Sequence, residues 1–214
     1  MANGSPLLAQ MASGSLGFSP AAIKAAKNRI RGHEGYRAKV YSDGKVNKDK
    51  ISTNATIGFG HLLMKVDKIT GKPLKGQRNK GINSLVNAGF SRNRARVLVD
   101  KLDGLTRNEA EWLFDSDVNI AASNALERLP NSPTYRPETQ VGIINGFYRG
   151  DLAQSKKTLG MIDNGDFLGA SGEFLRNDEY ANAVKNKQAG IRPRMEEIAR
   201  GFFSESATNQ GITY

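Results

Sequence analysis

The stretch that decides the fold is TRNEAEWLFDSDVNIAASNALERLPNSP, residues 106–133. It opens with a capping box, in which the side chains of Thr106 and Glu109 each accept a hydrogen bond from a backbone N–H at the start of a helix. Apolar side chains and one acid then recur on one helical face: Ala110, Leu113, Phe114, Asp117, Val118, Ala121 and Ala125. Pro130 and Pro133 cannot continue a helix. The stretch therefore predicts one long amphipathic helix.

Helical spacing also dominates the rest of the second half. It predicts helices over residues 137–147, 157–164, 167–175 and 193–203, followed by a tail from Ser204 that frays. Before the long helix, Ser91 is suited to cap a helix over residues 92–102. Residues 69–89 have little hydrophobic periodicity, and we expect an irregular connection there rather than one long helix.

The N-terminal part is expected to consist of an arm followed by a helix. Residues 1–18 are rich in Gly, Ser, Ala and Asn and predict a flexible arm; the alternative is a docking segment for another protein. Ser19-Pro20 is a favourable N-cap and first helical position. A helix face follows with Ile23, Ala26, Lys27 and Ile30. Gly32 and Gly35 bracket the end of this helix, which leaves Glu34 in its last turn or just past it.

The next segment has the two-residue period of strands. Ala38, Val40 and Tyr41 predict a strand followed by a turn at Asp43-Gly44, and residues 55–61 predict a second, glycine-punctuated strand. Together these patterns predict an α+β fold. A small antiparallel-sheet lobe would span about residues 31–66 and a larger helical lobe about residues 91–203, within one domain over residues 19–203.

Composition narrows the classes of partner. The 214 residues carry 31 Lys and Arg against 21 Asp and Glu, a net charge of +10, which attracts polyanions such as nucleic acid, anionic lipid and the bacterial cell wall. The basic residues form no long tract and no ribonucleoprotein or zinc-finger signature, so we expect no nucleic-acid partner. Cysteine is absent, which excludes disulfides and thiolate chemistry. No apolar run is long enough to span a bilayer, and we read no export signal.

One group of residues is suited to glycoside hydrolysis. That reaction needs a proton donor for the leaving oxygen and a second group that activates water or attacks the sugar. A partly buried glutamic acid can serve as donor because burial disfavours the charged carboxylate. A hairpin that leaves the helix end at Glu34 can bring Asp43 and Thr56 to face that acid.

Three short segments resemble the signature of the phage-type lysozymes, glycoside hydrolase family 24. They are Glu34-Gly35-Tyr36-Arg37, Tyr41-Ser42-Asp43 and Thr56-Ile57-Gly58-Phe59-Gly60-His61. Residues 105–118 resemble the segment that opens that family's helical lobe, and residues 144–148 resemble a helix that lines its cleft. The similarity runs patchily from Ile30 to Phe203, and the segment from Glu34 to His61 is its specific part.

The resemblance implies a lysozyme-like fold with its active-site cleft between two lobes, and a role for each matching residue. Glu34 corresponds to the general acid, Asp43 to the carboxylate that orients or activates water, and Thr56 to the residue that helps hold that water. His61 and Arg194 would support the site structurally. The residues that lie near saccharide-contacting positions are Leu62, Tyr148 and Thr158.

The resemblance also implies a monomeric muramidase that needs no metal and no other cofactor. It would cut the β-1,4 bond between N-acetylmuramic acid and N-acetylglucosamine in peptidoglycan. Such an enzyme stays in the host cytoplasm until lysis and then acts on the wall, delivered by a holin or as a virion component. Three features depart from the compact family members: the loop between Asp43 and Thr56 is longer and basic, residues 69–89 predict an irregular connection between the lobes rather than one long helix, and the N-terminal arm is additional.

Three alternatives stay open. A lytic transglycosylase cuts the same bond without water, and would not need Asp43 and Thr56. A zinc endopeptidase or amidase would have to draw its metal ligands from a chain with only His33 and His61, no cysteine and no HExxH motif. A wall-binding or virion structural protein would not depend on Glu34.

Overall fold

The computed structural model describes residues 17–46, 52–185, 188 and 190–209. The predicted arm over residues 1–18 falls largely outside these residues. Phe18 is described, and it is buried, 4% exposed, so ordered packing begins before Ser19. The chain divides into two compact units: a sheet unit, Glu34–Asp117, and a helical unit, Met1–His33 with Val118–Tyr214. The fold is α+β, with the strands confined to the sheet unit.

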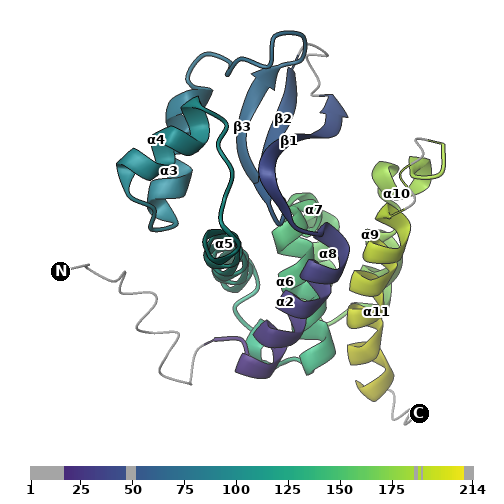
Figure 1. The fold of residues 1–214 in the computed structure, drawn as a ribbon. Helices are drawn as coiled ribbons and strands as arrows, with labels where there is room; N and C mark the ends of the chain where they lie inside the picture. The colour runs from purple at the N-terminus through teal and green to yellow at the C-terminus, as the bar shows by residue number, and fades with distance from the viewer. Residues whose placement is uncertain (1–16, 47–51, 186–187, 189, 210–214) are drawn as a thin grey trace. The chain divides into compact units, whose positions relative to one another are not determined.

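The sheet unit contains a three-stranded antiparallel sheet (Figure 1). Its strands are β1 (Arg37–Val46), β2 (Ser52–Gly58) and β3 (His61–Asp67), in the order β1-β2-β3. The predicted turn at Asp43-Gly44 is wrong, because both residues lie within β1. The strand predicted to continue to His61 ends at Gly58, and the chain reverses at Phe59-Gly60. Gly60 thus lies at a reversal of the chain and not within one continuous strand, as had been predicted.

The first pair of strands is irregular. Tyr41 pairs with Thr56 and Ser42 with Ala55, and the register shifts on both sides of these pairs. Between Ser42 and Val46 lie the three residues 43–45, whereas one residue, Asn54, separates their partners Ala55 and Thr53. Such extra residues bend a strand and increase its twist. The irregular pairing explains why the Asp43-Gly44 turn signal produced no turn.

The sheet unit also contains two short helices, α3 (Gln77–Asn87) and α4 (Arg92–Asp100). Helix α3 packs on β3 and on α4 (Figure 1). The irregular connection predicted over residues 69–89 is thus correct only for its first part, because burial of Ile82 and Leu85 stabilises a helix that the sequence pattern did not reveal. The predicted cap is confirmed: the Ser91 side chain accepts a hydrogen bond from the backbone N–H of Arg94.

The long predicted helix is α5 (Arg107–Arg128), which runs through the boundary between the two units. Its capping box is present. The backbone N–H of Thr106 donates to Glu109 Oε2 at 2.8 Å, and the backbone N–H of Glu109 donates to Thr106 Oγ1 at 3.2 Å. The helix ends two residues before Pro130, as expected from the proline.

The helical unit holds the remaining described helices. They are α2 (Pro20–Glu34), whose last residue belongs to the sheet unit, η1 (Ser132–Thr134), α6 (Pro137–Arg149), α7 (Asp151–Gln154), α8 (Lys156–Asp163), α9 (Phe167–Phe174), α10 (Asp178–Asn182) and α11 (Ile191–Asn209). The predicted Ser19 cap is confirmed by a 3.1 Å bond from the backbone N–H of Ala22 to Ser19 Oγ. The short helices α7 and α10 were not predicted.

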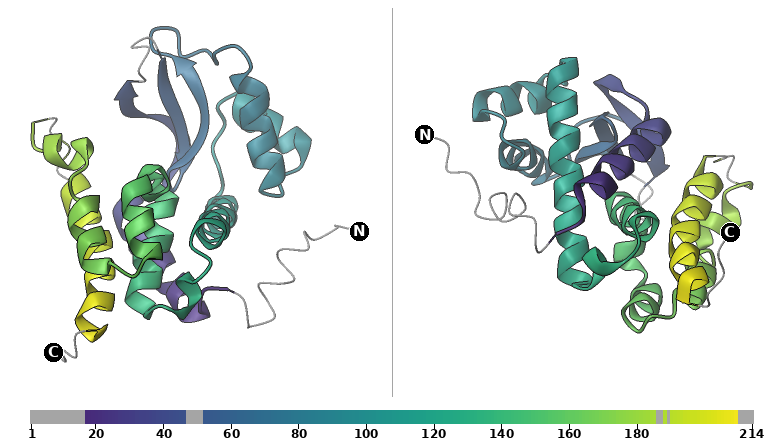
Figure 2. Two further views of the ribbon diagram at one scale, coloured as in Figure 1. Left: turned by 180° about the vertical axis from the view of Figure 1, so that it is seen from behind. Right: turned by 90° about the horizontal axis from the view of Figure 1, so that it is seen from below.

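Helices α6 and α11 pack against each other (Figure 2), and a glycine on each helix lies at the contact. A Cβ atom on Gly142 would lie 3.0 Å from the carbonyl oxygen of Ile198, and one on Gly201 would lie 2.8 Å from that of Glu138. The hydroxyl of Thr139 also donates to the carbonyl oxygen of Gly201 at 2.9 Å. The backbones can approach this closely because neither glycine carries a side chain.

The predicted frayed tail from Ser204 is wrong for the residues up to Asn209, which continue α11. The carboxylate of Glu205 accepts a hydrogen bond from the backbone N–H of Arg136 at 2.8 Å, and its Oε2 atom lies 2.9 Å from the Thr139 hydroxyl, whose one proton is shared between this carboxylate and the carbonyl oxygen of Gly201. These long-range bonds hold the end of α11 against the start of α6. Residues 210–214 lie outside the described part of the chain.

Candidate active site

Glu34 is the last residue of α2, and it is half-buried. The next residue, Gly35, has a φ of +63°, in the left-handed region that commonly ends a helix. A residue with a side chain would be strained there. The glycine at position 35 therefore explains why α2 ends at the acid, as the sequence predicted.

The carboxylate of Glu34 lies against the turn between β2 and β3. A Cβ atom on Gly60 would lie 3.2 Å from Glu34 Oε2 and 3.5 Å from its Cδ. Gly60 also has a φ of +95°, which residues other than glycine rarely adopt. The absence of a side chain at position 60 allows the turn to approach the acid closely. Gly60 belongs to the motif over residues 56–61, but no role was predicted for it.

A cluster of aromatic rings and one arginine supports the backbone on both sides of this contact. The rings of Tyr36 and Phe59 have centroids 5.6 Å apart. The guanidinium of Arg107 lies 4.7 Å from the ring centroid of Tyr36 and 5.1 Å from that of Phe59, which are cation–π distances. Tyr36 follows Glu34 by two residues and Phe59 directly precedes Gly60. The cluster therefore holds both segments that meet at the carboxylate.

Further contacts anchor this cluster to the rest of the sheet unit. The Tyr36 hydroxyl donates to the carbonyl oxygen of Leu105 at 3.1 Å, and the ring of Phe59 lies 5.1 Å from that of Phe114. The backbone N–H of Leu105 donates to the carbonyl oxygen of Ala38 at 2.9 Å. This cluster could not be predicted from the sequence, because its members are separated by up to about seventy residues.

An ion-pair network holds the segment that carries Leu105 and Arg107. Arg94 donates to both carboxylate oxygens of Glu109, at 2.8 and 2.9 Å, and to Asp103 and the carbonyl oxygen of Gly104. These hydrogen bonds from Arg94 lower the pKa of Glu109 to about 2, with help from the backbone N–H of Thr106 and against an opposing effect of burial. Glu109 is therefore ionised at neutral pH and ties α4 to the start of α5.

Thr56 lies in β2, between Tyr41 of β1 and Leu62 of β3. It is buried, 4% exposed, and its hydroxyl oxygen has no hydrogen-bond partner among the described residues. Leaving a buried hydroxyl unpaired costs about 1–3 kcal/mol, and most buried polar side chains therefore have a partner. Thr56 is therefore an unusual polar group in the middle of the sheet.

Asp43 lies in the irregular part of β1, two residues beyond the partner of Thr56. Its side chain lies outside the described residues. The long basic loop predicted between Asp43 and Thr56 is wrong for most of its length, because residues 44–46 belong to β1 and residues 52–55 to β2; residues 47–51 lie outside the described part of the chain. The backbone of Asp43 is thus in the strand adjacent to β2. Leu62, a predicted saccharide contact, is half-exposed and pairs directly with Thr56.

His61 begins β3 and is 9% exposed. Its Nδ1 atom lies 3.0 Å from each carboxylate oxygen of Asp117, and its Nε2 atom lies 3.2 Å from Ser84 Oγ. Both ring nitrogens are thus within hydrogen-bond distance of side chains from α5 and α3. This is the geometry of a histidine that joins elements of the fold.

Arg194 acts within the helical unit. Its guanidinium donates to the backbone carbonyl of His33, the residue directly before Glu34. A cation at this place satisfies a carbonyl that the helix itself leaves unpaired at its C-terminus. The neighbouring Glu197 binds the His33 ring at 2.7 Å and Arg29 at 3.2 Å. Together these bonds attach the C-terminal end of α2 to α11.

The other two predicted saccharide contacts belong to the helical unit. Tyr148 lies in α6 and is half-buried. Thr158 lies in α8 and is 1% exposed. Their contact with a saccharide stays a prediction.

Comparison with protein-family models and with curated proteins finds no match for this sequence. Within the described part of the chain, no group of three or more histidine, aspartate or glutamate side chains is arranged to hold a metal ion. The described helices also include none that combines the length and the apolar character required to cross a bilayer.

Proposed function

We propose that this protein is a muramidase, a glycoside hydrolase that cuts the β-1,4 bond between N-acetylmuramic acid and N-acetylglucosamine in bacterial peptidoglycan. The resemblance of residues 34–61 to the phage-type lysozymes supports a role in phage-driven lysis. The proposal assigns the general acid to Glu34, the water-activating carboxylate to Asp43 and a water-holding hydroxyl to Thr56.

The observation that carries the proposal is the contact between the Glu34 carboxylate and the Gly60 turn. A side chain at position 60 would crowd the carboxylate, so the glycine leaves room for the acid to lie against the turn. Here one side of the acid is enclosed by backbone, and an aromatic and cationic cluster supports the segments that enclose it. Such support from packed neighbours is what a positioned catalytic group requires.

The unpaired hydroxyl of Thr56 adds a second line of support. It lies on the strand that leads into the Gly60 turn, so one short hairpin carries both features. In the proposed reaction, Glu34 donates its proton to the glycosidic oxygen as the bond to the anomeric carbon breaks. Water adds to that carbon and gives up a proton to Asp43. The hydroxyl of Thr56 orients the water.

The decisive variant is Glu34→Gln, which removes the proton donor while keeping the shape of the side chain. We expect folding by circular dichroism to be unchanged and the release of reducing ends from purified peptidoglycan to be lost. Glu127→Gln, which removes an exposed carboxylate from the far end of α5, provides a control with the same change of charge. If Glu34→Gln digests peptidoglycan at the rate of this control, the assignment of the acid is wrong.

Mass spectrometry of the products separates the proposal from its nearest rivals. Hydrolysis adds one water and leaves a reducing N-acetylmuramic acid, whereas a lytic transglycosylase leaves an anhydro-muramyl end. New amino groups without new reducing ends would instead indicate an endopeptidase or amidase. Either of these outcomes would overturn the proposed reaction.

A further inference from the structure

The chain between β3 and α3 forms an ordered turn that the proposed reaction does not use (Figure 1). The backbone N–H of Asp67 donates to the carbonyl oxygen of Lys72 at 2.8 Å, and that of Gly71 donates to the carbonyl oxygen of Asp67 at 2.9 Å. Val66 and Pro73 form an antiparallel bridge next to these bonds. The segment therefore extends β3 by one tight reversal beyond Asp67.

The side chain of Asp67 orders this reversal. Its Oδ1 atom accepts hydrogen bonds from the backbone N–H groups of Ile69 and Thr70, at 3.0 and 2.7 Å, and from the Thr70 hydroxyl at 2.9 Å. The bond from the Thr70 N–H is the main reason that the pKa of Asp67 lies below its ordinary value, so the carboxylate is ionised at neutral pH. The conformation of the turn is thus fixed by its own hydrogen bonds.

Ile69 lies in the middle of this turn and is 93% exposed, the largest value among the exposed large hydrophobic side chains of the described residues. A single exposed apolar side chain is common on protein surfaces. Here, however, Asp67 binds the backbone N–H of the isoleucine, so the ordered turn presents this side chain to water. The fold therefore keeps a hydrocarbon side chain at a place where a polar one would fold equally well.

Four lysines flank Ile69 in the sequence, and all four are exposed: Lys65, Lys68, Lys72 and Lys75. None of their ammonium groups forms an ion pair or a hydrogen bond with another described residue. Asp67 is the one acid among residues 65–75, so four lysines and one aspartate give this segment a net charge of +3. We call residues 65–75 the lysine turn.

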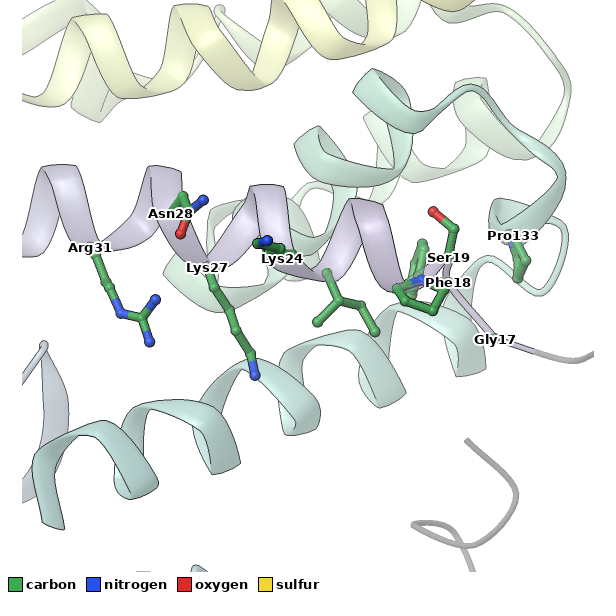
Figure 3. A pocket seen from close by; sticks show the side chains of 10 residues that line it. Gly17, Phe18, Ser19, Lys24, Lys27, Asn28, Arg31 and Pro133 are labelled. Carbon is green, nitrogen blue, oxygen red and sulfur yellow. The ribbon is translucent and has the colours of Figure 1, made fainter. Parts of the chain in front are cut away.

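The cations along α2 differ from those of the lysine turn. Lys24, Lys27 and Arg31 line a groove of about 700 Å³ in the helical unit (Figure 3). Lys27 and Arg31 already make interactions of their own, so the charge of this groove does not call for a ligand. The lysine turn is therefore the better candidate for a surface that binds an anionic partner.

A bilayer that contains anionic lipids fits both features of the lysine turn. Anionic headgroups attract lysines that lie near the membrane surface. The boundary between headgroups and acyl chains can bury an apolar side chain, and binding grows with the apolar area buried there. A nucleic acid would contact the lysines but leave Ile69 in water. One projecting apolar side chain among unpaired cations thus favours a membrane surface over a soluble polyanion.

We propose that the lysine turn binds the surface of an anionic bilayer. The side chain of Ile69 enters the headgroup region, and the four lysines contact lipid phosphates. This inference does not depend on Glu34, and the Glu34→Gln variant should bind vesicles as the unmodified chain does. Failure of the proposed reaction and failure of this surface would therefore be separate results.

The first test is co-sedimentation of the full chain with vesicles of equal parts phosphatidylcholine and phosphatidylglycerol. The variant Lys68→Gln/Lys72→Gln/Lys75→Gln should bind about a hundredfold more weakly at low salt, since each lysine near such a surface contributes about fivefold. Vesicles of phosphatidylcholine alone should bind the unmodified chain far less tightly. Tight binding to these neutral vesicles would contradict the role of the lysines.

The matched control is Lys24→Gln/Lys156→Gln/Lys185→Gln. It removes three exposed lysines of the helical unit and the same charge, and it should bind nearly as tightly as the unmodified chain. Because all six side chains are exposed, circular dichroism should show both triple variants to be folded. Equal losses of affinity in the two variants would overturn the proposal, because they would show binding by net charge alone.

The second test concerns the apolar side chain and leaves the charge unchanged. Ile69→Ser should bind the anionic vesicles about tenfold more weakly, since it removes most of the apolar area that the bilayer would bury. Val184→Ser, at a position that is 68% exposed, is the control and should retain the affinity. Because the chain has no cysteine, Ile69→Cys and Val184→Cys can each carry a single environment-sensitive fluorophore. Only the label at position 69 should shift its emission to shorter wavelength when anionic vesicles are added.

Two results of the second test would overturn the bilayer as partner. The first is an Ile69→Ser variant that binds as tightly as Val184→Ser, with no emission shift at position 69, because the isoleucine would then stay in water. The second is a nucleic-acid surface. It would appear as a loss of binding to a single-stranded oligothymidylate in the lysine-turn triple variant that is as large as the loss with vesicles, while Ile69→Ser changes neither.

Discussion

Replacing Gly60 with alanine tests whether the turn between β2 and β3 controls the acid. The new methyl group would lie 3.2 Å from Glu34 Oε2, which is closer than a normal contact, and at an ordinary 3.5 Å from Cδ. The carboxylate or the turn would have to move by a few tenths of an ångström. A misplacement of about 1 Å can reduce a catalytic rate roughly a hundredfold, so we expect Gly60→Ala to lose about tenfold in rate.

The same change also strains the backbone, and Gly58→Ala separates the two effects. Gly58 has a φ of +68° and Gly60 a φ of +95°, so alanine is disfavoured at both positions by about 1–2 kcal/mol. A methyl group on Gly58 would make an ordinary 3.4 Å contact with Leu105 Cδ1, and Glu34 is absent from its nearest neighbours. Both variants should therefore lose about 2–8 °C in Tm.

The assay is the initial rate of reducing-end release from purified peptidoglycan, measured well below the Tm of either variant. The expected result is a similar loss of Tm in the two variants and a much larger loss of rate for Gly60→Ala. Equal rates for the two alanine variants would refute the reasoning, because the carboxylate would then be insensitive to the one contact that distinguishes them.

Three further changes probe other parts of the sheet unit. Thr56→Val should leave Tm unchanged or raise it, since it removes a buried hydroxyl without a described partner. The valine variant should nevertheless lose activity, whereas Thr56→Ser should retain it. A clear loss of Tm in the valine variant would show that the hydroxyl is hydrogen-bonded. Glu109→Gln keeps the cap but loses the ion pair with Arg94. The pKa of Glu109 is about 2 in the folded chain, against an ordinary value of 4.5. The wild-type chain should therefore exceed this variant in free energy of unfolding by about 1–2 kcal/mol above pH 4.5, and the difference should disappear as the pH falls toward 2. A constant difference in unfolding free energy across that range would contradict the assignment. Asp117→Ala leaves His61 Nδ1 without its acceptor and should cost about 1–3 kcal/mol in chemical unfolding, and a neutral result would exclude a structural role for the pair.

The capped helix starts and the end of α2 could be predicted from the sequence. Ser19, Ser91 and the Thr106–Glu109 box make hydrogen bonds to backbone groups three residues away. Gly35 likewise ends α2 through its own φ angle. Because these interactions are local, the residues themselves specify them. The position of Glu34 at a helix end is also fixed by local interactions, so it could be predicted from the sequence.

The sequence-based predictions were wrong where contacts between distant segments determine the structure. The turn signal at Asp43-Gly44 was overridden by pairing with β2, and Phe59-Gly60 formed the reversal instead. The end of α11 is helical because Glu205 bonds to groups near the start of α6, about seventy residues earlier. Local propensity says nothing about such pairings, since their energy comes from contacts made only after the chain has folded.

The sequence by itself determined the α+β class, the caps, the long helix α5 and the identity of the candidate acid. Only the tertiary structure decided what surrounds that acid. The approach of Gly60, the stacking of Arg107 on Tyr36 and Phe59, and the bond from Arg194 to the end of α2 all join residues far apart in the chain. A residue pattern can specify a backbone angle or a helix face, but the neighbours of a side chain depend on how the segments pack.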